Sequence, residues 1–276
     1  MKKIGFVVDS TFGNVGDMAK VVPLNVYIDN KEYIDGTFDN NLIVDALKND
    51  LEVKTSQPSP NLFLMAFEEA LEEYDHVICL TISKTLSGTI NSAILAKGML
   101  EDEERVTVID TKTVNLGSSY ILEEAYKKAN DNYSLKDVLN YIDELILKGS
   151  IIFSVDDLDT LVKGGRLSKI NAFIGNIFKI KPILRFKEGV LNVEARVRGL
   201  MGVFRHILKQ VEEMFSSEKI TVRVTYVDNL DYANNMKERI ENLNHKNLSV
   251  QITEQLTAAV AAHIGLGGMG IYLINN

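Results

Sequence analysis

Short apolar runs that alternate with amphipathic stretches are the feature that most constrains how this chain can fold. The run His76–Ile82 is continuous and rich in β-branched residues, which is typical of a buried strand. The stretch Asn61–Tyr74 instead carries a wide apolar stripe that includes Leu62, Met65 and Phe67, and it predicts a core-facing helix. Repetition of the two patterns predicts an α/β protein with mostly parallel sheets.

The same reading assigns the other elements. Strands are expected at Lys3–Val8, His76–Ile82, Arg105–Ile109, Ile151–Val155, Ile180–Phe186, Val190–Arg196, Ile220–Tyr226, Ser249–Ile252 and Gly270–Ile274. Helices are expected at Asn41–Asn49, Asn61–Tyr74, Ser87–Met99, Ser118–Asn130, Leu135–Lys148, Leu200–Phe215 and Asp231–Asn242.

A domain boundary is expected near Lys148-Gly149-Ser150. A chain of 276 residues is long enough for two domains of ordinary size. We therefore expect an N-terminal α/β domain over residues 1–149 and a C-terminal α/β domain over residues 150–276. In the second domain, the turn Lys187-Glu188-Gly189 between two strand-like runs predicts a hairpin.

Composition favours a globular protein of the cytoplasm. Hydrophobic residues make up 46% of the chain and charged residues 25%, and no apolar run reaches the 18 or so residues of a membrane span. Asp9 interrupts the first apolar run too early for a signal peptide, so that run is expected to be a strand. Cys79 is the single cysteine, which excludes a disulfide and predicts a buried, inert thiol.

Charge is unevenly distributed along the chain. The net charge of −8 argues against nucleic acid as the main partner. Between Thr160 and Val211, however, eleven Lys and Arg stand against Glu188 and Glu194, a local balance of +9. Such a segment fits a surface for an anionic partner, although folding could equally disperse it over a solvated face.

Two clusters of hydroxyl residues are each expected at the start of a helix. They are Thr55-Ser56-Gln57-Pro58-Ser59-Pro60 and Ser83-Lys84-Thr85-Leu86-Ser87-Gly88-Thr89. A helix start presents unpaired N–H groups and the positive end of the helix dipole, so hydroxyls there suit a carboxylate or a phosphate. The plain alternative is that Ser59 and Ser87 are ordinary N-caps.

Further polar residues suit the same chemistry. His263 lies in a glycine-rich surround that would let the backbone approach a bound group closely. Arg166, Arg196 and Arg198 remain charged and can hold a phosphate or a carboxylate with two hydrogen bonds. Asp9 and its counterpart Asp110 end strands, and we expect structural or mouth-lining roles for them and no metal site.

Several motifs together resemble those of the DegV family of bacterial fatty-acid-binding proteins. They occur in the family's order from residue 4 to residue 271, so the resemblance covers essentially the whole chain. The motifs are Val7-Val8-Asp9-Ser10-Thr11, Thr55–Pro60, Leu86-Ser87-Gly88-Thr89 with Asn91-Ser92-Ala93, Val108-Ile109-Asp110-Thr111, Lys163-Gly164-Gly165-Arg166-Leu167-Ser168-Lys169, Ile180-Lys181-Pro182-Ile183-Leu184, and His263 with its glycines.

The resemblance implies a protein with two α/β domains and a lipid tunnel between them. Its ligand would be a long-chain fatty acid, with no other cofactor, held through its carboxyl group by Thr55, Ser87 and His263. Ser56, Ser83, Gly88 and Thr89 would be secondary contacts. Candidates for the tunnel lining, which could equally be plain core, are Phe153, Phe173, Ile174, Ile177, Phe178 and Ile183.

The resemblance also implies that the protein is not an enzyme by itself. It would present the fatty acid to a separate ATP-dependent fatty acid kinase through the region of Arg166, Arg196 and Arg198, and transient contact with a membrane surface stays open. Two departures from the family pattern concern the loop after His263, where Leu266 replaces a common Pro, and Gly199-Leu200-Met201, which replaces further basic residues.

Three other interpretations are open from the sequence. Ser87 as nucleophile with His263 as base would make a hydrolase, although Leu86-Ser87-Gly88 is not the Gly-x-Ser-x-Gly elbow. A phosphoryl carrier or small phosphotransferase would receive phosphate on His263 or at a helix start. A regulatory or scaffolding protein would hold its lipid only as a structural element.

Overall fold

The computed structural model describes residues 3–156, 158–167, 180–215 and 218–275. Its first sheet has four parallel strands in the order β2-β1-β6-β7. The predicted parallel α/β arrangement is confirmed for this sheet. The strands are β1 (Ile4–Asp9), β2 (Lys20–Val22), β6 (His76–Thr81) and β7 (Val106–Asp110).

Helices cover both faces of the first sheet. Successive residues of a strand point to opposite faces, so Val7 packs in one apolar cluster while Phe6 and Val8 pack in another. The Val7 side is covered by α2 and α3, and the Phe6 side by α4 and α5. These helices are α2 (Pro60–Glu73), α3 (Thr89–Lys97), α4 (Leu116–Asn130) and α5 (Leu135–Lys148).

The second sheet has six strands in the order β10-β9-β8-β13-β11-β12. Its β11–β12 pair is parallel, and its other four pairs are antiparallel. The expectation of mostly parallel strands is therefore wrong here, because β9 and β10 are joined by a two-residue turn and β13 lies antiparallel to both of its neighbours. The strands are β8 (Ser150–Ser154), β9 (Ile180–Lys187), β10 (Val190–Arg198), β11 (Ile220–Tyr226), β12 (Leu248–Ile252) and β13 (Met269–Asn275).

The predicted hairpin is confirmed. Its turn residues Glu188 and Gly189 have φ angles of 50° and 79°. Positive φ at both central positions is typical of a type I′ turn, whose twist matches that of the flanking strands. Gly189 adopts this conformation without the steric cost that a Cβ would bring.

A third sheet of three short antiparallel strands was not expected from the sequence. It has the order β4-β3-β5 and shares one apolar cluster with α1 and with α9 from the far end of the chain. The elements are β3 (Asn25–Ile28), β4 (Lys31–Ile34), β5 (Val53–Ser56), α1 (Asn41–Lys48) and α9 (Ala258–Ile264).

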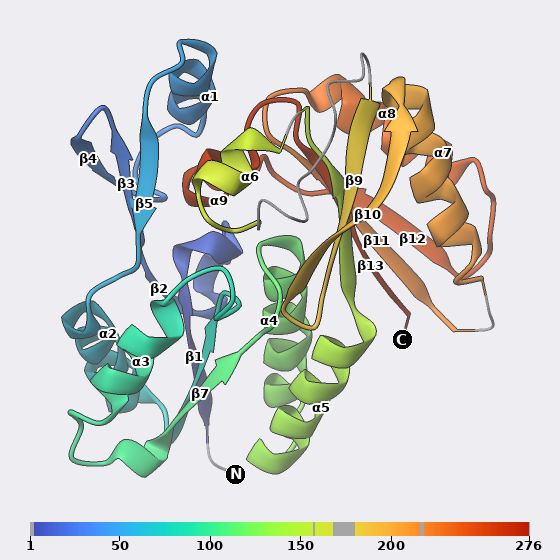
Figure 1. The fold of residues 1–276 in the computed structure, drawn as a ribbon. Coiled ribbons are helices and arrows are strands. Elements are labelled where there is room, and N and C mark those ends of the chain that lie inside the picture. Colours follow the sequence, from blue (N-terminus) through green and yellow to red (C-terminus); the bar gives the residue numbers. More distant parts are fainter. Residues whose placement is uncertain (1–2, 157, 168–179, 216–217, 276) are drawn as a thin grey trace.

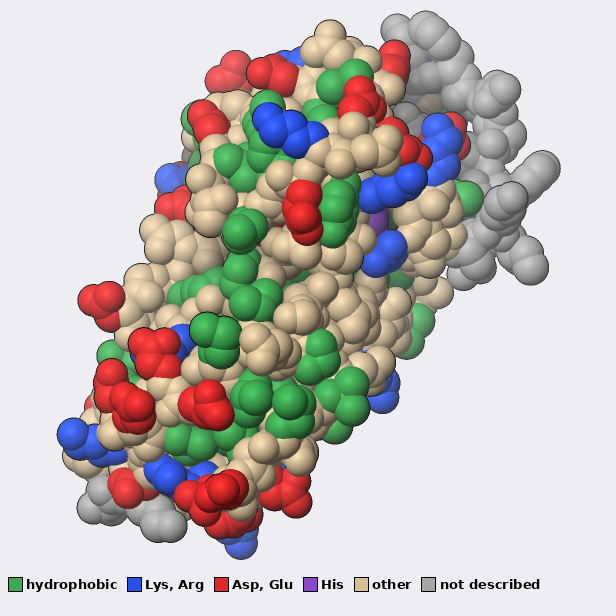
Figure 2. Space-filling model, turned by 90° about the vertical axis from the view of Figure 1, so that its left-hand side faces the viewer, with side chains coloured by type: hydrophobic (Ala, Val, Ile, Leu, Met, Phe, Trp, Pro, Cys, Tyr) green, Lys and Arg blue, Asp and Glu red, His purple; other side chains and the backbone are tan. Residues whose placement is uncertain are grey.

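The layers follow from these contacts. Helices α4 and α5 lie between the first and second sheets, while α7 and α8 cover the outer face of the second sheet (Figure 1). The face that carries α1, the third sheet, α2 and α3 is turned toward the viewer in Figure 2. The remaining helices are α6 (Asp159–Lys163), α7 (Gly199–Glu212), α8 (Leu230–Glu241), η1 (Ser10–Phe12), η2 (Gly16–Met18) and η3 (Glu103–Arg105).

The division of the chain at residue 149 remains a prediction. The strands of the first and third sheets all precede residue 149 and those of the second sheet follow it, but α9 packs against the third sheet. Within the described residues, none of the helices is long and apolar enough to span a membrane.

Candidate ligand-binding site

The site lies at the carboxyl ends of the first sheet's central strands. From β1 the chain moves to β2 on one side, and later returns as β6 on the other side. Such a reversal of strand order leaves a crevice beyond the strand ends, where α/β proteins commonly bind ligands. Here the crevice receives Thr11 from the segment after β1 and Ile82 and Ser87 from the segment after β6.

Asp9 fixes the two segments against each other. Its fully buried carboxylate accepts hydrogen bonds from the backbone N–H and hydroxyl of Thr11 and, at 2.7 Å, from the N–H of Ile82. Burial is the main reason that the pKa of Asp9 rises to about 6, and these hydrogen bonds oppose the rise. Asp9 is thus a structural residue beneath the site.

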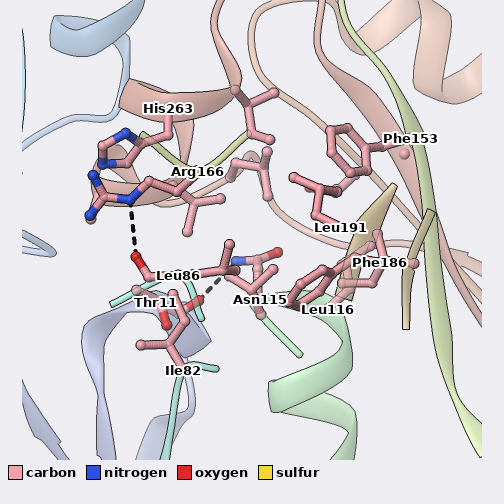
Figure 3. Close-up of a pocket in the computed structure, with 18 of the residues that line it drawn as sticks. Thr11, Ile82, Leu86, Asn115, Leu116, Phe153, Arg166, Phe186, Leu191 and His263 are labelled. Atoms are coloured by element: carbon pink, nitrogen blue, oxygen red, sulfur yellow. Dashed lines mark hydrogen bonds between the residues drawn. The ribbon is translucent and has the colours of Figure 1, made fainter. Parts of the chain in front are cut away.

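A largely apolar cavity of about 100 Å³ extends from the crevice toward the second sheet (Figure 3). Its apolar wall comes from the segment after β6, from α4 and from the second sheet. Ligand pockets typically range from about 300 to 1,000 Å³, so a long acyl chain could enter only if this wall moved apart. The apolar wall includes Leu86, Leu116, Phe153, Phe186 and Leu191.

His263 and Thr55 form a polar end of the cavity. The imidazole Nε2 of His263 on α9 lies 2.7 Å from the hydroxyl of Thr55 on β5. Burial, with a smaller contribution from the Arg166 charge, lowers the pKa of His263 to about 4. The imidazole is therefore neutral at physiological pH, where it can donate from one ring nitrogen and accept at the other.

Arg166 also lines the polar end of the cavity. Its Nε donates to the carbonyl of Leu86 at 3.0 Å, and its Nη1 donates to the carbonyl of Gly164 at 2.5 Å. The guanidinium lies beside the imidazole of His263 (Figure 3). Burial lowers the pKa of Arg166, but a guanidinium remains charged in proteins, so this end of the cavity carries a fixed positive charge.

Ser87 lines the cavity from the loop that leads into α3. Its hydroxyl lies 2.8 Å from that of Thr89 and accepts a hydrogen bond from the Thr89 N–H at 3.3 Å. Under the plain alternative Ser87 would be the N-cap of α3, but the N-cap is Gly88, one residue later. Ser59 is the N-cap of α2, but its side chain makes no capping hydrogen bond.

Four predicted secondary contacts lie outside the cavity wall as the structure describes it. Ser83 is fully buried and bonds to Thr85, whose hydroxyl donates to the carbonyl of Gly189 in the β9–β10 turn. The hydroxyl of Ser56 lies 3.5 Å from that of Tyr27. Gly88 is covered by the side chain of Gln57, and Thr89 is buried with its hydroxyl against that of Ser87.

The remaining candidate residues are the arginines expected to contact a partner and the residues expected to line the tunnel. Arg196 and Arg198 lie on exposed positions of β10, away from the cavity. Phe153 is in the wall, whereas Ile183 is buried beneath α7 and α8, as the plain-core alternative expected. Phe173, Ile174, Ile177, Phe178, Ser168 and Lys169 lie outside the described residues.

Asn115 is a wall residue that the sequence reading missed. It precedes α4 with a φ of 44°, and its side-chain amide donates to the carbonyl of Thr11 at 3.2 Å. Positive φ is uncommon outside glycine, and Asn is one of the residues that adopt it most often. An Asn directly before a predicted helix could therefore have indicated a tight turn near the strand ends.

A wide vestibule connects the polar end with the surface. It measures about 820 Å³, and Thr55, Arg166 and His263 line both it and the inner cavity. Lys54 and Lys163 stand in its wall together with acidic residues. Among the described residues, no cluster of His, Cys, Asp and Glu could hold a metal ion.

These features define a class: α/β proteins with a largely apolar cavity between two sheets and a polar end that is reached from a vestibule. The chain belongs to the DegV family, because the family's model, described as "Uncharacterised protein, DegV family", matches residues 3–276. A DegV domain-containing protein of Caldanaerobacter subterraneus is 30% identical over 281 residues, covering 99% of each chain.

Two solved structures show the same fold. One is a DegV family protein from Thermus thermophilus whose structure concerns fatty acid binding. It is 32% identical to this chain, with a TM-score of 0.91, and the match covers 100% of both chains. A DegV lipid-binding protein from Thermotoga maritima is 27% identical with a TM-score of 0.83, covering 99% of this chain and 98% of its own.

Proposed function

We propose that this protein binds a long-chain fatty acid with its carboxyl group at Thr55, Ser87 and His263. The observation that carries the proposal is one cavity with an apolar wall and a polar end formed by these three residues and Arg166. A fatty acid has the same two parts. The fatty acid binding of the Thermus relative supports the choice of ligand.

The energetics of such a complex are favourable. Burial of about 14 methylenes at about 0.8 kcal/mol each gives about 11 kcal/mol before the costs of association and of widening the cavity. A carboxylate would gain charge-assisted hydrogen bonds from the hydroxyls and the guanidinium. The apolar tail therefore supplies affinity, and the polar end fixes the direction of the chain.

We further propose that the carboxyl group is presented to a separate ATP-dependent kinase. The vestibule reaches Thr55, Arg166 and His263, so a phosphoryl donor on another protein could approach a carboxyl group there. The exposed Arg196 and Arg198 on β10 would assist docking through their charge. On this proposal the protein is the substrate-presenting partner and not itself a catalyst.

The hydrolase alternative finds less support in the geometry. A serine nucleophile requires a base within hydrogen-bond reach. The hydroxyl of Ser87 bonds to Thr89, while the imidazole Nε2 of His263 bonds to Thr55. The imidazole is thus engaged with a different hydroxyl from the one that would have to attack.

Native mass spectrometry of the purified protein, followed by organic extraction, tests the binding proposal. A mass excess that extracts as fatty acid supports it. A ligand-free mass that persists after incubation with a panel of fatty acids would refute it. A phosphorylated protein in place of a phosphorylated lipid would favour the phosphoryl-carrier alternative.

Substitutions test the assigned roles. Ser87→Ala should weaken fatty-acid retention, with Ser59→Ala as the matched control at a helix start outside the cavity. Arg166→Gln should weaken retention and also phosphorylation, because its charge stands in the wall. Arg196→Ala should impair phosphorylation alone. Unchanged retention in Ser87→Ala would show that the carboxyl group lies elsewhere.

A further inference from the structure

Helices α2 and α3 expose an unusual amount of apolar surface. The sequence pattern places Leu62 and Met65 in a core-facing stripe, but they are 38% and 57% exposed, while Phe63 and Phe67 from the same stripe are fully buried. On α3 and just after it, Ile94, Leu95 and Met99 are 51%, 61% and 59% exposed. We call these five exposed residues the α2/α3 patch.

The patch lies on one face of the molecule. Helices α2 and α3 pack directly against each other, through Phe63, Phe67, Ala93 and Ala96 beneath them. Figure 2 shows hydrophobic side chains gathered over the lower part of this face, where these helices lie. Clustered apolar side chains on a protein surface mark interaction sites more often than scattered ones do.

Acidic residues border the patch. On α2, Glu68 and Glu72 lie three and seven positions after Met65, so all three share one side of the helix. After α3 and the three residues that follow it, the chain continues as Glu101-Asp102-Glu103-Glu104, all exposed. Figure 2 shows red side chains beside and below the green ones. This rim repels an anionic lipid surface and attracts Lys and Arg.

The patch also lies close in the chain to the ligand site. Helix α2 follows the segment that begins at Thr55, and α3 begins two residues after Ser87. The side chain of Gln57 joins the two segments, because its amide donates to Ser92 on α3 at 2.9 Å. A protein bound across α2 and α3 would therefore sit beside the loops that carry Thr55 and Ser87.

We propose that the α2/α3 patch is a docking surface for a protein whose contact face is apolar and ringed by Lys and Arg. The protein that binds there is the kinase to which the carboxyl group is presented. This identification rests on the proposed function. A second copy of this chain fits less well, because an acidic-rimmed patch does not complement itself, so the contact would have to be head-to-tail. The patch and the vestibule would then be contacted by one partner.

The test measures the Kd between the purified, lipid-loaded protein and the purified fatty acid kinase of the same host. We expect Met65→Ser/Leu95→Ser to raise Kd roughly tenfold or more. Glu68→Lys/Glu72→Lys should raise Kd and reduce its dependence on ionic strength, because two of the rim carboxylates are replaced by like-charged groups. Leu147→Ser and Glu144→Lys on α5 are matched controls, exposed but away from the patch, and should leave Kd within about twofold.

Other outcomes would overturn the inference. These are an unchanged Kd in both double variants, or a wild-type protein that does not bind the kinase. If the wild type binds phosphatidylglycerol–phosphatidylcholine vesicles and Met65→Ser/Leu95→Ser does not, the patch is a membrane-binding surface. If the wild type is a dimer and this double variant is a monomer, the patch is a self-association surface. Extracted fatty acid is quantified for each protein, so failure of lipid binding is detected separately from failure of docking.

Discussion

His263 provides a measurable link between pH and the stability of this fold, because its surroundings hold the imidazole neutral. Its pKa falls from 6.5 to about 4 in the folded protein. The unfolded chain therefore binds a proton more readily than the folded one. The contribution of this group to stability is complete above pH 6.5, and it is lost as the pH falls toward the folded pKa.

The size of the effect follows from the shift. At about 1.36 kcal/mol per pKa unit, the full loss is about 3 kcal/mol below pH 4. At pH 5 the unfolded chain is mostly protonated and the folded protein mostly is not, which corresponds to a loss of about 2 kcal/mol relative to pH 8. A loss of this size is a large fraction of the stability of an ordinary domain.

The assay is urea unfolding at pH 8 and at pH 5, for the wild type and for His263→Gln. The amide of Gln can still bond to Thr55 but does not titrate. Other groups contribute equally to both proteins, including Asp9, whose raised pKa acts in the opposite direction by favouring the folded state as the pH falls. The difference between the two proteins therefore isolates His263, and we expect the wild type to lose about 2 kcal/mol more.

An equal loss in the two proteins would refute the reasoning. It would mean that the imidazole is protonated in the folded protein despite its burial. An NMR titration of the imidazole protons gives the same answer directly, since a midpoint near 4 is expected and one near 6.5 contradicts it. Coincident circular dichroism and tyrosine fluorescence transitions check that unfolding is two-state.

Three further predictions concern the structure around the site. Arg223 is 4% exposed and joins the second sheet to Glu123 on α4, so Arg223→Met should lower the free energy of urea unfolding by about 2–3 kcal/mol, and adding Glu123→Gln should recover part of the loss. An added Cβ at Gly88 would lie 2.0 Å from the Gln57 side-chain oxygen, so Gly88→Ala should lower the unfolding free energy by about 1 kcal/mol, and Gln57→Ala in the same protein should remove most of that effect. The thiol of Cys79 is fully buried and burial raises its pKa, so it should react with a disulfide reagent only as fast as urea unfolds the protein; a fast reaction in native buffer would contradict its burial.

Much of the fold could be predicted because long elements carry strong patterns. The run His76–Ile82 is buried throughout as β6, and Leu135–Lys148 is a helix with the capping box of Ser134 and Asp137 at its start. The third sheet was missed because its strands are four residues long and two of them are largely polar, as in Lys31–Ile34. Such strands are stabilised by tertiary packing, which the local sequence does not reveal.

Strand direction and side-chain contacts were the other limits. Apolar runs such as Gly270–Ile274 identify a strand, but pairing on both sides decides whether it lies parallel or antiparallel to its neighbours. The hydroxyl clusters led to Thr55 and Ser87 in the cavity wall. They also suggested Ser83 and Thr89, which lie outside the cavity wall, because the sequence does not show which hydroxyls of a cluster face the cavity.

The cavity is assembled from two parts of the chain that can change independently of each other. Thr55 and Ser87 belong to segments around the first and third sheets, whereas Phe153, Phe186 and Leu191 belong to strands of the second sheet. Substitutions on those strands would reshape the apolar wall and leave the polar end intact. Natural variation or protein engineering could therefore alter which ligand tail is accepted while conserving the way its head is held.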